Sequence, residues 1–379
     1  MSHDVMNYAD GHLDAPGVGG FNAKEGFSQN SVEAQRSLDL AVERSNDLGV
    51  QLFAVSGDLF HSGNPSPEIV ARAVERLRRL NAKWIVADGN HDQSGVPTGH
   101  RNALAAYLAE QPGCVGVYSE PAVHEFNGLY VAVLPWLKVS NSNLLGATNK
   151  ALEENVERLA GLIPDGSPSI MIGHVTLAEC TFDSGLRGSE VNMSTSTLEA
   201  SIPTSKIDEG PWSVARFGHI HKRQQLSDKT GYTGSPYKVS FGETNDDKGV
   251  DLISIDADKA TVAFQRFDVR ELIKVDLTKE DGAANSVSAR PGDVVRLVAD
   301  SDHLARAEAL ARAFVESGAQ AHIHRIPDVM VAIAREAQYS TEMAPTEALS
   351  AYLVKKDVAE AKRPAIVNAF ADVSASCQH

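Results

Sequence analysis

Short apolar runs alternate with longer amphipathic segments through the first half of the chain. The apolar runs have the length and composition of buried or half-buried strands, and they occupy residues 51–56, 83–87, 129–134, 169–172 and 213–217. Helical patterns occupy residues 31–48 and 149–162, and a third begins at Pro67, with Ser66 placed to cap its first turn. Strands that alternate with helices predict an α/β core whose sheet is at least partly parallel.

The pattern changes near residue 245, where paired apolar runs replace the alternation of strands and helices. Residues 250–255 and 261–267 flank a polar turn and predict a hairpin. A small strand–helix–strand unit is then predicted, followed by two short terminal helices, at residues 294–299, 303–317, 320–326, 347–355 and 359–371. We therefore expect three parts, residues 1–245, 250–330 and 335–379.

Composition argues against a disordered or fibrous protein, and the net charge limits how the chain could bind nucleic acid. Hydrophobic residues make up 42% of the chain and charged residues 22%, which is normal for a globular protein. The formal net charge is −15, so nucleic acid could be bound only through a local basic patch or through metal ions. The cysteines Cys114, Cys180 and Cys377 form no C-x-x-C pair, which favours a reducing cytoplasm over a disulfide framework. We expect neither a signal peptide nor a membrane span.

Five short polar motifs follow or end the predicted strands, where open α/β sheets place their functional sites. They are Asp10-Gly11-His12, Gly57-Asp58-Leu59-Phe60, Gly89-Asn90-His91-Asp92, Gly173-His174 and Gly218-His219-Ile220-His221. Their carboxylate, amide and imidazole groups, without a thiolate, suit catalytic Mn²⁺, Fe²⁺ or Zn²⁺. Alone, the motifs at Asp10, Asp58 and His174 are more often turns or hydrogen-bonded histidines. The motif at residues 89–92 is more specific, and the one at 218–221 is a fair metal signal, although alternating exposed histidines are its alternative. The complete set, in one order, indicates a metal site most strongly.

The number of candidate ligands favours two ions over one. The candidates exceed the needs of a single ion that must keep an open position, whereas two ions about 3.5–4 Å apart share a bridging carboxylate. Two aspartates against two divalent ions leave a formal charge of +4 − 2 = +2. That charge would attract a phosphate group even on an acidic protein.

The order of these motifs resembles the calcineurin-like metallophosphoesterase family over residues 1–245. The resemblance implies a four-layer α/β/β/α sandwich with a dinuclear metal site. It implies that one ion is held by Asp10, His12 and His221, the other by Asn90, His174 and His219, and that Asp58 bridges them. At Gly11 the family usually has a larger residue, whose side chain should not face the metals.

A narrower resemblance points to the SbcD branch of nucleases. The segment at 57–68, GDLFHSGNPSPE, carries the second histidine of that branch at His61, and the later residues 232–236, 241–243 and Lys248 also match. By this resemblance, residues 250–330 form a small α+β domain that caps DNA, and the C-terminal helices bind an SbcC-like ATPase. The implied activity is a Mn²⁺-dependent DNA exonuclease and endonuclease of repair or recombination, with two divalent ions, Mn²⁺ favoured.

The remaining motif residues have expected roles in catalysis. His91 would act as a general acid or stabilise the charged transition state, and Asp92 would orient His91 and keep it protonated. The alternative for Asp92 is a cap of its loop. His61 would position the leaving strand, or it would be an ordinary polar residue of its loop.

The basic residues divide into two groups. The run from Arg72 to Lys83 is spread around a helix and fits a solvated face. Residues near the metal motifs are better placed to contact a DNA backbone, namely Lys222, Arg223 and Lys238.

Two competing hypotheses keep the same fold. One is a small-molecule phosphodiesterase or phosphatase, and the other is a non-catalytic scaffold, against which the complete ligand set argues. A homodimer is an open alternative, and no membrane association is expected.

Overall fold

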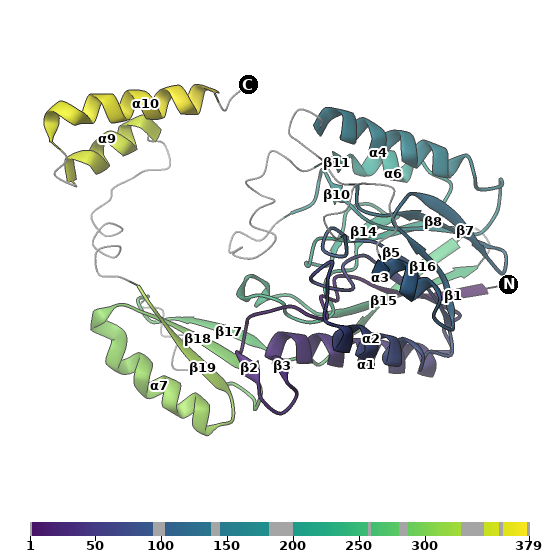
Figure 1. Cartoon of the computed structure of the whole chain (residues 1–379), viewed down its shortest axis with the longest axis horizontal. Coiled ribbons are helices and arrows are strands. Elements are labelled where there is room, and N and C mark those ends of the chain that lie inside the picture. Colours follow the sequence, from purple (N-terminus) through teal and green to yellow (C-terminus); the bar gives the residue numbers. More distant parts are fainter. Residues whose placement is uncertain are drawn as a thin grey trace.

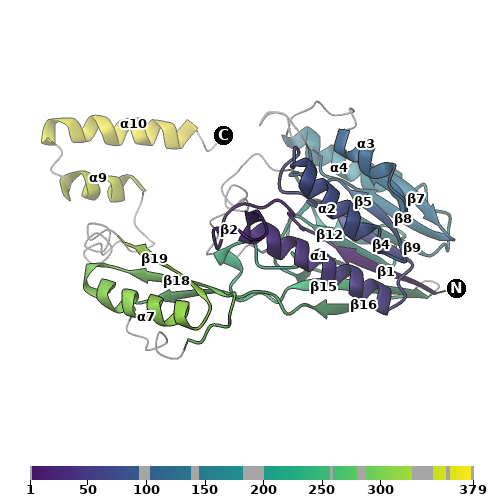
Figure 2. The same ribbon diagram turned by 60° about the horizontal axis from the view of Figure 1, so that its bottom comes forward.

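The computed structural model describes residues 2–93, 103–137, 145–181, 200–256, 259–279, 287–326, 345–355 and 359–376. Two six-stranded sheets lie face to face, with helices on their outer sides (Figures 1 and 2). A smaller three-stranded sheet with its own helix follows along the chain, and two helices come last.

The first large sheet has the strand order β16-β15-β1-β4-β5-β6. Its strands are β1 (Ser2–Tyr8), β4 (Leu52–Ser56), β5 (Lys83–Ala87), β6 (Cys114–Tyr118), β15 (Gly249–Asp256) and β16 (Lys259–Arg266). The pairs from β1 to β6 are parallel, whereas β15 runs antiparallel to both β1 and β16. The carboxyl ends of the parallel strands therefore lie at one edge of the sheet.

The second large sheet has the order β13-β14-β12-β9-β8-β7. Its strands are β7 (Ala122–Phe126), β8 (Leu129–Leu134), β9 (Ser169–His174), β12 (Val214–Gly218), β13 (Gln224–Gln225) and β14 (Thr230–Tyr232). The four central strands are parallel, and an antiparallel strand closes each edge. The short pairs β2 (Phe21–Asn22) with β3 (Phe27–Ser28), and β10 (Thr176–Leu177) with β11 (Ser201–Ile202), form two minor sheets.

Alternation along β4 shows how the layers are built. Leu52 and Ala54 lie in the core between the two large sheets, whereas Phe53 and Val55 pack on the outer side. The outer side of the first sheet is covered by α1 (Gln29–Asp47), α2 (Pro67–Leu77) and α3 (Ala103–Ala109), and that of the second by α4 (Leu145–Ala160) and α6 (Thr204–Asp208). This arrangement confirms the predicted four-layer sandwich.

Helix capping explains where two of these helices begin. Ser66 accepts a hydrogen bond from the amide of Ile69, and Pro67 takes the first helical position, as predicted. Helix α1 begins at Gln29, two residues before the predicted start, because Ser28 caps it by accepting from the amide of Ser31.

The hairpin of β15 and β16 belongs to the first large sheet. The sequence pattern placed it in the small domain, but β15 pairs with β1 from Ser2↔Asp256 to Asn7↔Asp251. The large domain therefore extends to Arg266, and the expected boundary at 245–250 is too early.

The small domain is a parallel sheet in the order β17-β18-β19, with one helix packed on it. Its elements are β17 (Leu272–Asp276), which the pattern did not predict, β18 (Val294–Ala299), the 3-10 turn η4 (Ser301–His303), α7 (Leu304–Glu316) and β19 (Gln320–Arg325). Contacts that join it to the large domain include the pair of Glu271 with Lys238 and the Arg296 guanidinium, which lies 3.9 Å from the Phe241 ring centroid.

The last two helices, α9 (Pro345–Lys355) and α10 (Arg363–Ser376), follow the small domain with η5 (Glu360–Lys362) between them. Figures 1 and 2 both draw them beside each other and away from the large sheets. Exposed apolar side chains on this pair are Tyr352, Val354, Ile366 and Phe370. Among the described helices, none is both long and apolar enough to cross a membrane.

Candidate metal centre

The five motifs meet at one edge of the sandwich, where the two large sheets end. Each motif lies at or just after the carboxyl end of a strand, because parallel strands bring these ends to the same edge. The residues placed there are Asp10 and His12 after β1, Asp58 after β4, Asn90 and His91 after β5, His174 at the end of β9, and His219 and His221 after β12.

The backbone at this edge is unusually strained. Asp10, His12, Asp58 and His219 have φ angles of 53°, 43°, 50° and 98°, in the left-handed region that non-glycine residues seldom adopt. Such residues cost on the order of 1–3 kcal/mol each and cluster at functional sites. Main-chain hydrogen bonds between motifs hold the conformation, as in the 2.9 Å bond from the amide of His12 to the carbonyl of Asp58.

Two glycines permit this close packing. A Cβ atom on Gly57, whose φ is 86°, would lie 2.1 Å from Nδ1 of His174. A Cβ atom on Gly89 would lie 2.0 Å from Oδ1 of Asp58. Any larger residue at either position would displace a candidate ligand.

One group of donors is formed by Asp10, His12 and His221, whose ligand atoms lie within 4.8 Å of one another. Nε2 of His12 is 3.1 Å from Nε2 of His221 and 3.7 Å from Oδ2 of Asp58. Oδ2 of Asp10 is buried without a hydrogen-bond partner among the described residues. A buried carboxylate oxygen of this kind fits a bound cation.

A second group surrounds His174. Nδ1 of His174 donates to the carbonyl of Ser56 at 3.0 Å, so a neutral ring has its lone pair on Nε2. Nε2 of His174 lies 3.3 Å from Oδ2 of Asp58 and 2.9 Å from Oδ1 of Asn90. The same Asn90 oxygen lies 3.1 Å from Nδ1 of His219. These acceptors converge as ligands of a second cation would, with Asp58 between the two groups.

The electrostatics of the metal-free site are dominated by burial and by Asp58. Burial alone would lower the pKa of His174, but the Asp58 carboxylate outweighs it and raises that pKa to about 9. Burial opposes the charge of Asp58 as well, yet His174 holds the pKa of this carboxyl well below its usual value. Burial keeps the pKa of His12 well below 6.5, so His12 is a neutral imidazole suited to bind a metal.

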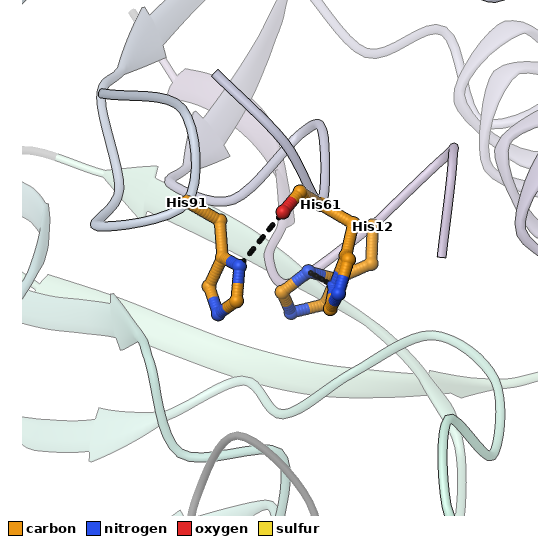
Figure 3. A group of neighbouring side chains, drawn as sticks. All are labelled: His12, His61 and His91. Carbon is orange, nitrogen blue, oxygen red and sulfur yellow. Dashed lines mark hydrogen bonds between the residues drawn. The ribbon is translucent and has the colours of Figure 1, made fainter. Parts of the chain in front are cut away.

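His61 and His91 lie beside the first group of donors (Figure 3). Nδ1 of His91 donates to the carbonyl oxygen of His61 at 2.8 Å, and the two rings stack with centroids 4.7 Å apart. Nδ1 of His61 is 3.3 Å from Nδ1 of His12. Burial, followed by the neighbouring His91, lowers the pKa of His61 to about 4, so its ring is neutral.

Asp92 holds the main chain of two loops that carry candidate site residues. Its carboxylate accepts hydrogen bonds from the amides of Leu59, Phe60 and Gly89, at 3.3, 2.9 and 2.9 Å. Burial, followed by the neighbouring carboxylates, raises its pKa to about 8. Because Nδ1 of His91 is held by the main chain of His61, the geometry favours the loop-capping alternative for Asp92 over the predicted orienting role.

Two of the three predicted DNA contacts are engaged inside the protein. Lys238 is buried, and its ammonium group donates to the carbonyl of Thr244 and pairs with Glu271, so the prediction that it contacts DNA is wrong. Arg223 pairs with Asp251 at 3.0 Å and lies over the Phe264 ring. Lys222 is half-buried.

Two groups next to the candidate ligands were missed as site residues. Glu243 lies 3.1 Å from Nδ1 of His221, and the sequence pointed to it only as part of a resemblance. The Trp136 ring packs over His219 with centroids 4.7 Å apart. An aromatic residue two positions beyond a strand end was the available signal for Trp136.

The family model described as calcineurin-like phosphoesterase matches residues 28–223. Similar curated proteins include exonuclease subunit 1 of Enterobacteria phage T4, 25% identical over 55% of this chain and 54% of the phage protein. The SbcD component of the SbcCD nuclease of Staphylococcus epidermidis is 24% identical over 54% of this chain and 55% of its own, and that of Escherichia coli K12 is 24% identical over 66% and 64%.

In each of these relatives, the matched segment covers less than two thirds of the relative's own length. The family model, in contrast, spans more than half of this chain and includes every candidate ligand from Asp58 to His221, leaving out only Asp10 and His12. On the match of the family model, the chain belongs to the calcineurin-like phosphoesterase family.

Proposed function

We propose that the protein is a dinuclear, Mn²⁺-dependent phosphodiesterase that hydrolyses DNA, as an SbcD-like nuclease subunit in repair or recombination. The observation that carries the metal-dependent chemistry is the convergence of carboxylate, amide and imidazole ligands around Asp58, with a buried Asp10 oxygen left for a cation. The choice of DNA as substrate is supported by the relatives named as nucleases.

In this proposal Asp10, His12 and His221 would hold one ion, Asn90, His174 and His219 would hold the other, and Asp58 would be a ligand of both. Bound divalent ions supply Lewis acidity and lower the pKa of a bound water. Asp58 is fixed for a bridging role because Oδ1 accepts from the amide of His91 at 2.9 Å, while Oδ2 faces both histidine groups.

His91 is proposed as the proton donor to the leaving oxygen. Its Nδ1 proton is committed to the carbonyl of His61, so the nitrogen that exchanges a proton with substrate is Nε2. His61 contributes that carbonyl and packs its ring on His91, and it thereby sets the position of the donor.

The rest of the chain is proposed to engage DNA and a partner. The small domain would cap the DNA, and Lys222 would contact its backbone beside the metal ligands, with Arg223 reaching phosphate only by leaving Asp251. The exposed apolar side chains of α9 and α10 would bind an SbcC-like ATPase. The cytoplasm is the proposed location of this activity.

One assay tests the proposal. Purified protein with Mn²⁺ is given end-labelled linear DNA and, separately, bis(p-nitrophenyl) phosphate, with a chelator and the His91→Gln variant as controls. Cleavage of both substrates that is lost with chelator is the expected result. Turnover of the aryl diester without DNA cleavage would instead favour a small-molecule phosphodiesterase, and inactivity on both would contradict the proposal.

A further inference from the structure

A buried ionic network lies directly behind His221. Oε1 of Glu243 is 3.1 Å from Nδ1 of His221, and Oε2 is 2.7 Å from the ammonium of Lys248. The side chains of Glu243 and Lys248 are 3% and 0% exposed. Lys248 also donates to the carbonyl of His221 at 2.9 Å and to the hydroxyl of Ser235 at 2.8 Å.

The groups that contact the Glu243 carboxylate through the hydrogen bonds and ion pair described for it are all donors. Oε1 accepts from the amide of Ser240 at 3.1 Å as well as from His221. Oε2 accepts from the amide of Val239 at 3.2 Å and from the hydroxyl of Ser235 at 3.1 Å, in addition to Lys248. The carboxylate is therefore fixed in place on a short 3-10 turn, η2 (Phe241–Glu243), which Ser240 caps.

The contact with Glu243 determines which nitrogen of His221 carries the proton. A carboxylate only accepts, so Nδ1 of His221 is the donor, and the neutral ring keeps its lone pair on Nε2. Nε2 is the nitrogen that faces Nε2 of His12 at 3.1 Å, within the donor group that includes Asp10. A partner behind the ring thus presents the ligand atom on the metal side.

We propose that Glu243 is a positioning residue that fixes the orientation and tautomer of His221 for metal binding, and that Lys248 holds Glu243 in that role. This inference rests on one part of the proposed function, namely that a divalent ion binds between Asp10, His12 and His221. A purely structural ion pair would stabilise the fold without setting the proton on His221, and this difference can be measured.

The isosteric variant Glu243→Gln gives a specific expectation. Its amide group has one oxygen and one NH₂. The Lys248 ammonium and the Val239 amide favour the oxygen on their side over the side of the single Ser240 amide, because the ammonium carries a full charge. The NH₂ group then faces Nδ1 of His221, which must accept, and the ring proton moves to Nε2. In the double variant Glu243→Gln/Lys248→Met the amide can turn its oxygen back to His221, and the wild-type tautomer returns.

The test uses the metal-free protein of 379 residues with ¹⁵N-labelled histidine, in which long-range ¹H–¹⁵N correlation spectra report the protonated nitrogen of His221. The expected result is Nδ1–H in the wild type, Nε2–H in Glu243→Gln and Nδ1–H in the double variant. The matched control is Glu271→Gln, which alters a lysine-paired carboxylate that does not face a candidate ligand and leaves the His221 tautomer unchanged.

Mn²⁺ titration followed by electron paramagnetic resonance supplies a second measurement. Glu243→Gln is expected to weaken one of two Mn²⁺ sites by about 10–100-fold, with recovery in the double variant. A proton on Nε2 of His221 in the wild type would overturn the proposal, even if the variants fail to fold. So would unchanged Mn²⁺ affinity in folded Glu243→Gln. Neither measurement uses DNA, so failure of the nuclease assay and failure of this inference are distinguishable.

Discussion

Replacement of Asp58 by Asn removes one charge from the centre of the candidate site with little change in shape. Asp58 has a φ of 50°, and Asn adopts this left-handed conformation as readily as Asp, so the backbone should be kept. The metal-free protein then loses the carboxylate that lies 3.3 Å from Nε2 of His174.

The expected effect on His174 follows from this distance. At 3.3 Å and an effective dielectric of about 20, unit charges attract by about 5 kcal/mol, while about 1.4 kcal/mol moves a pKa by one. Loss of Asp58 should therefore bring the pKa of His174 well below about 9, because burial lowers it and only the smaller effects of Asp10 and the Ser56 main chain still raise it. In the wild type, a raised histidine pKa contributes stability that is full below pH 6.5 and is lost as the pH rises through about 9.

Proton NMR titration of His174 and urea unfolding of metal-free protein at pH 6 and pH 9.5 measure this effect. The wild type should lose stability between these pH values, and Asp58→Asn should lose much less. Asp208→Asn is the matched control, because that carboxylate accepts from the hydroxyls of Ser227 and Thr230 away from the site. A His174 pKa near 9 in Asp58→Asn would refute the electrostatic reasoning.

The same variant tests the bridging role of Asp58. Without the carboxylate that faces both donor groups, the protein should bind fewer than two Mn²⁺ ions and lose nearly all phosphodiester hydrolysis. Two bound ions with normal hydrolysis in Asp58→Asn would refute the dinuclear assignment.

Variants at His91, Gly89 and Asp88 test the neighbouring parts of the same sheet edge. His91→Gln should keep both Mn²⁺ ions by metal analysis but lower hydrolysis by about 10²–10⁴-fold, and loss of metal would instead make His91 a ligand. Gly89→Ala places a Cβ atom 2.0 Å from Oδ1 of Asp58 and should weaken Mn²⁺ binding, unlike Gly146→Ala on helix α4, which meets no atom within 4 Å. Burial raises the pKa of Asp88 to about 6, so the wild type loses stability as the pH rises from about 4 through 6. In urea unfolding, the gain in unfolding free energy from Asp88→Asn should therefore grow from pH 5 to pH 7. A gain that is the same at both pH values would contradict this prediction.

Local patterns were sufficient for much of the fold. Residues 83–87, 129–134 and 294–299 form strands with the predicted bounds, because a run of buried apolar residues has few alternatives in an α/β chain. The motif at Asp10 implied a strand before it, but no apolar run marked strand β1 (Ser2–Tyr8), whose polar residues include the buried Asn7, which donates to Thr233. Polar residues that are satisfied by distant partners hide a strand from a periodicity argument.

The candidate metal residues were accessible to sequence reasoning for a related reason. Each follows a strand, and parallel strands bring their carboxyl ends to one edge whatever their order in the sheet. The meeting of the motifs at one edge thus needed only the class of fold, whereas the grouping around Asp58 came from the family resemblance. The distances, the strained φ angles and the orphaned oxygen of Asp10 are properties of the assembled edge.

Only the tertiary structure showed which strands and side chains contact each other when they are far apart in the sequence. The β15–β16 hairpin looks like the start of a new domain, yet it adds to β1, because a hairpin's pattern specifies its faces but not the strand that it joins. Lys238 looks available to DNA, yet its ammonium is buried against Glu271. Glu243 reaches His221 across 22 positions of sequence. Such contacts depend on how separate segments pack in space, which local hydrophobicity and charge do not encode.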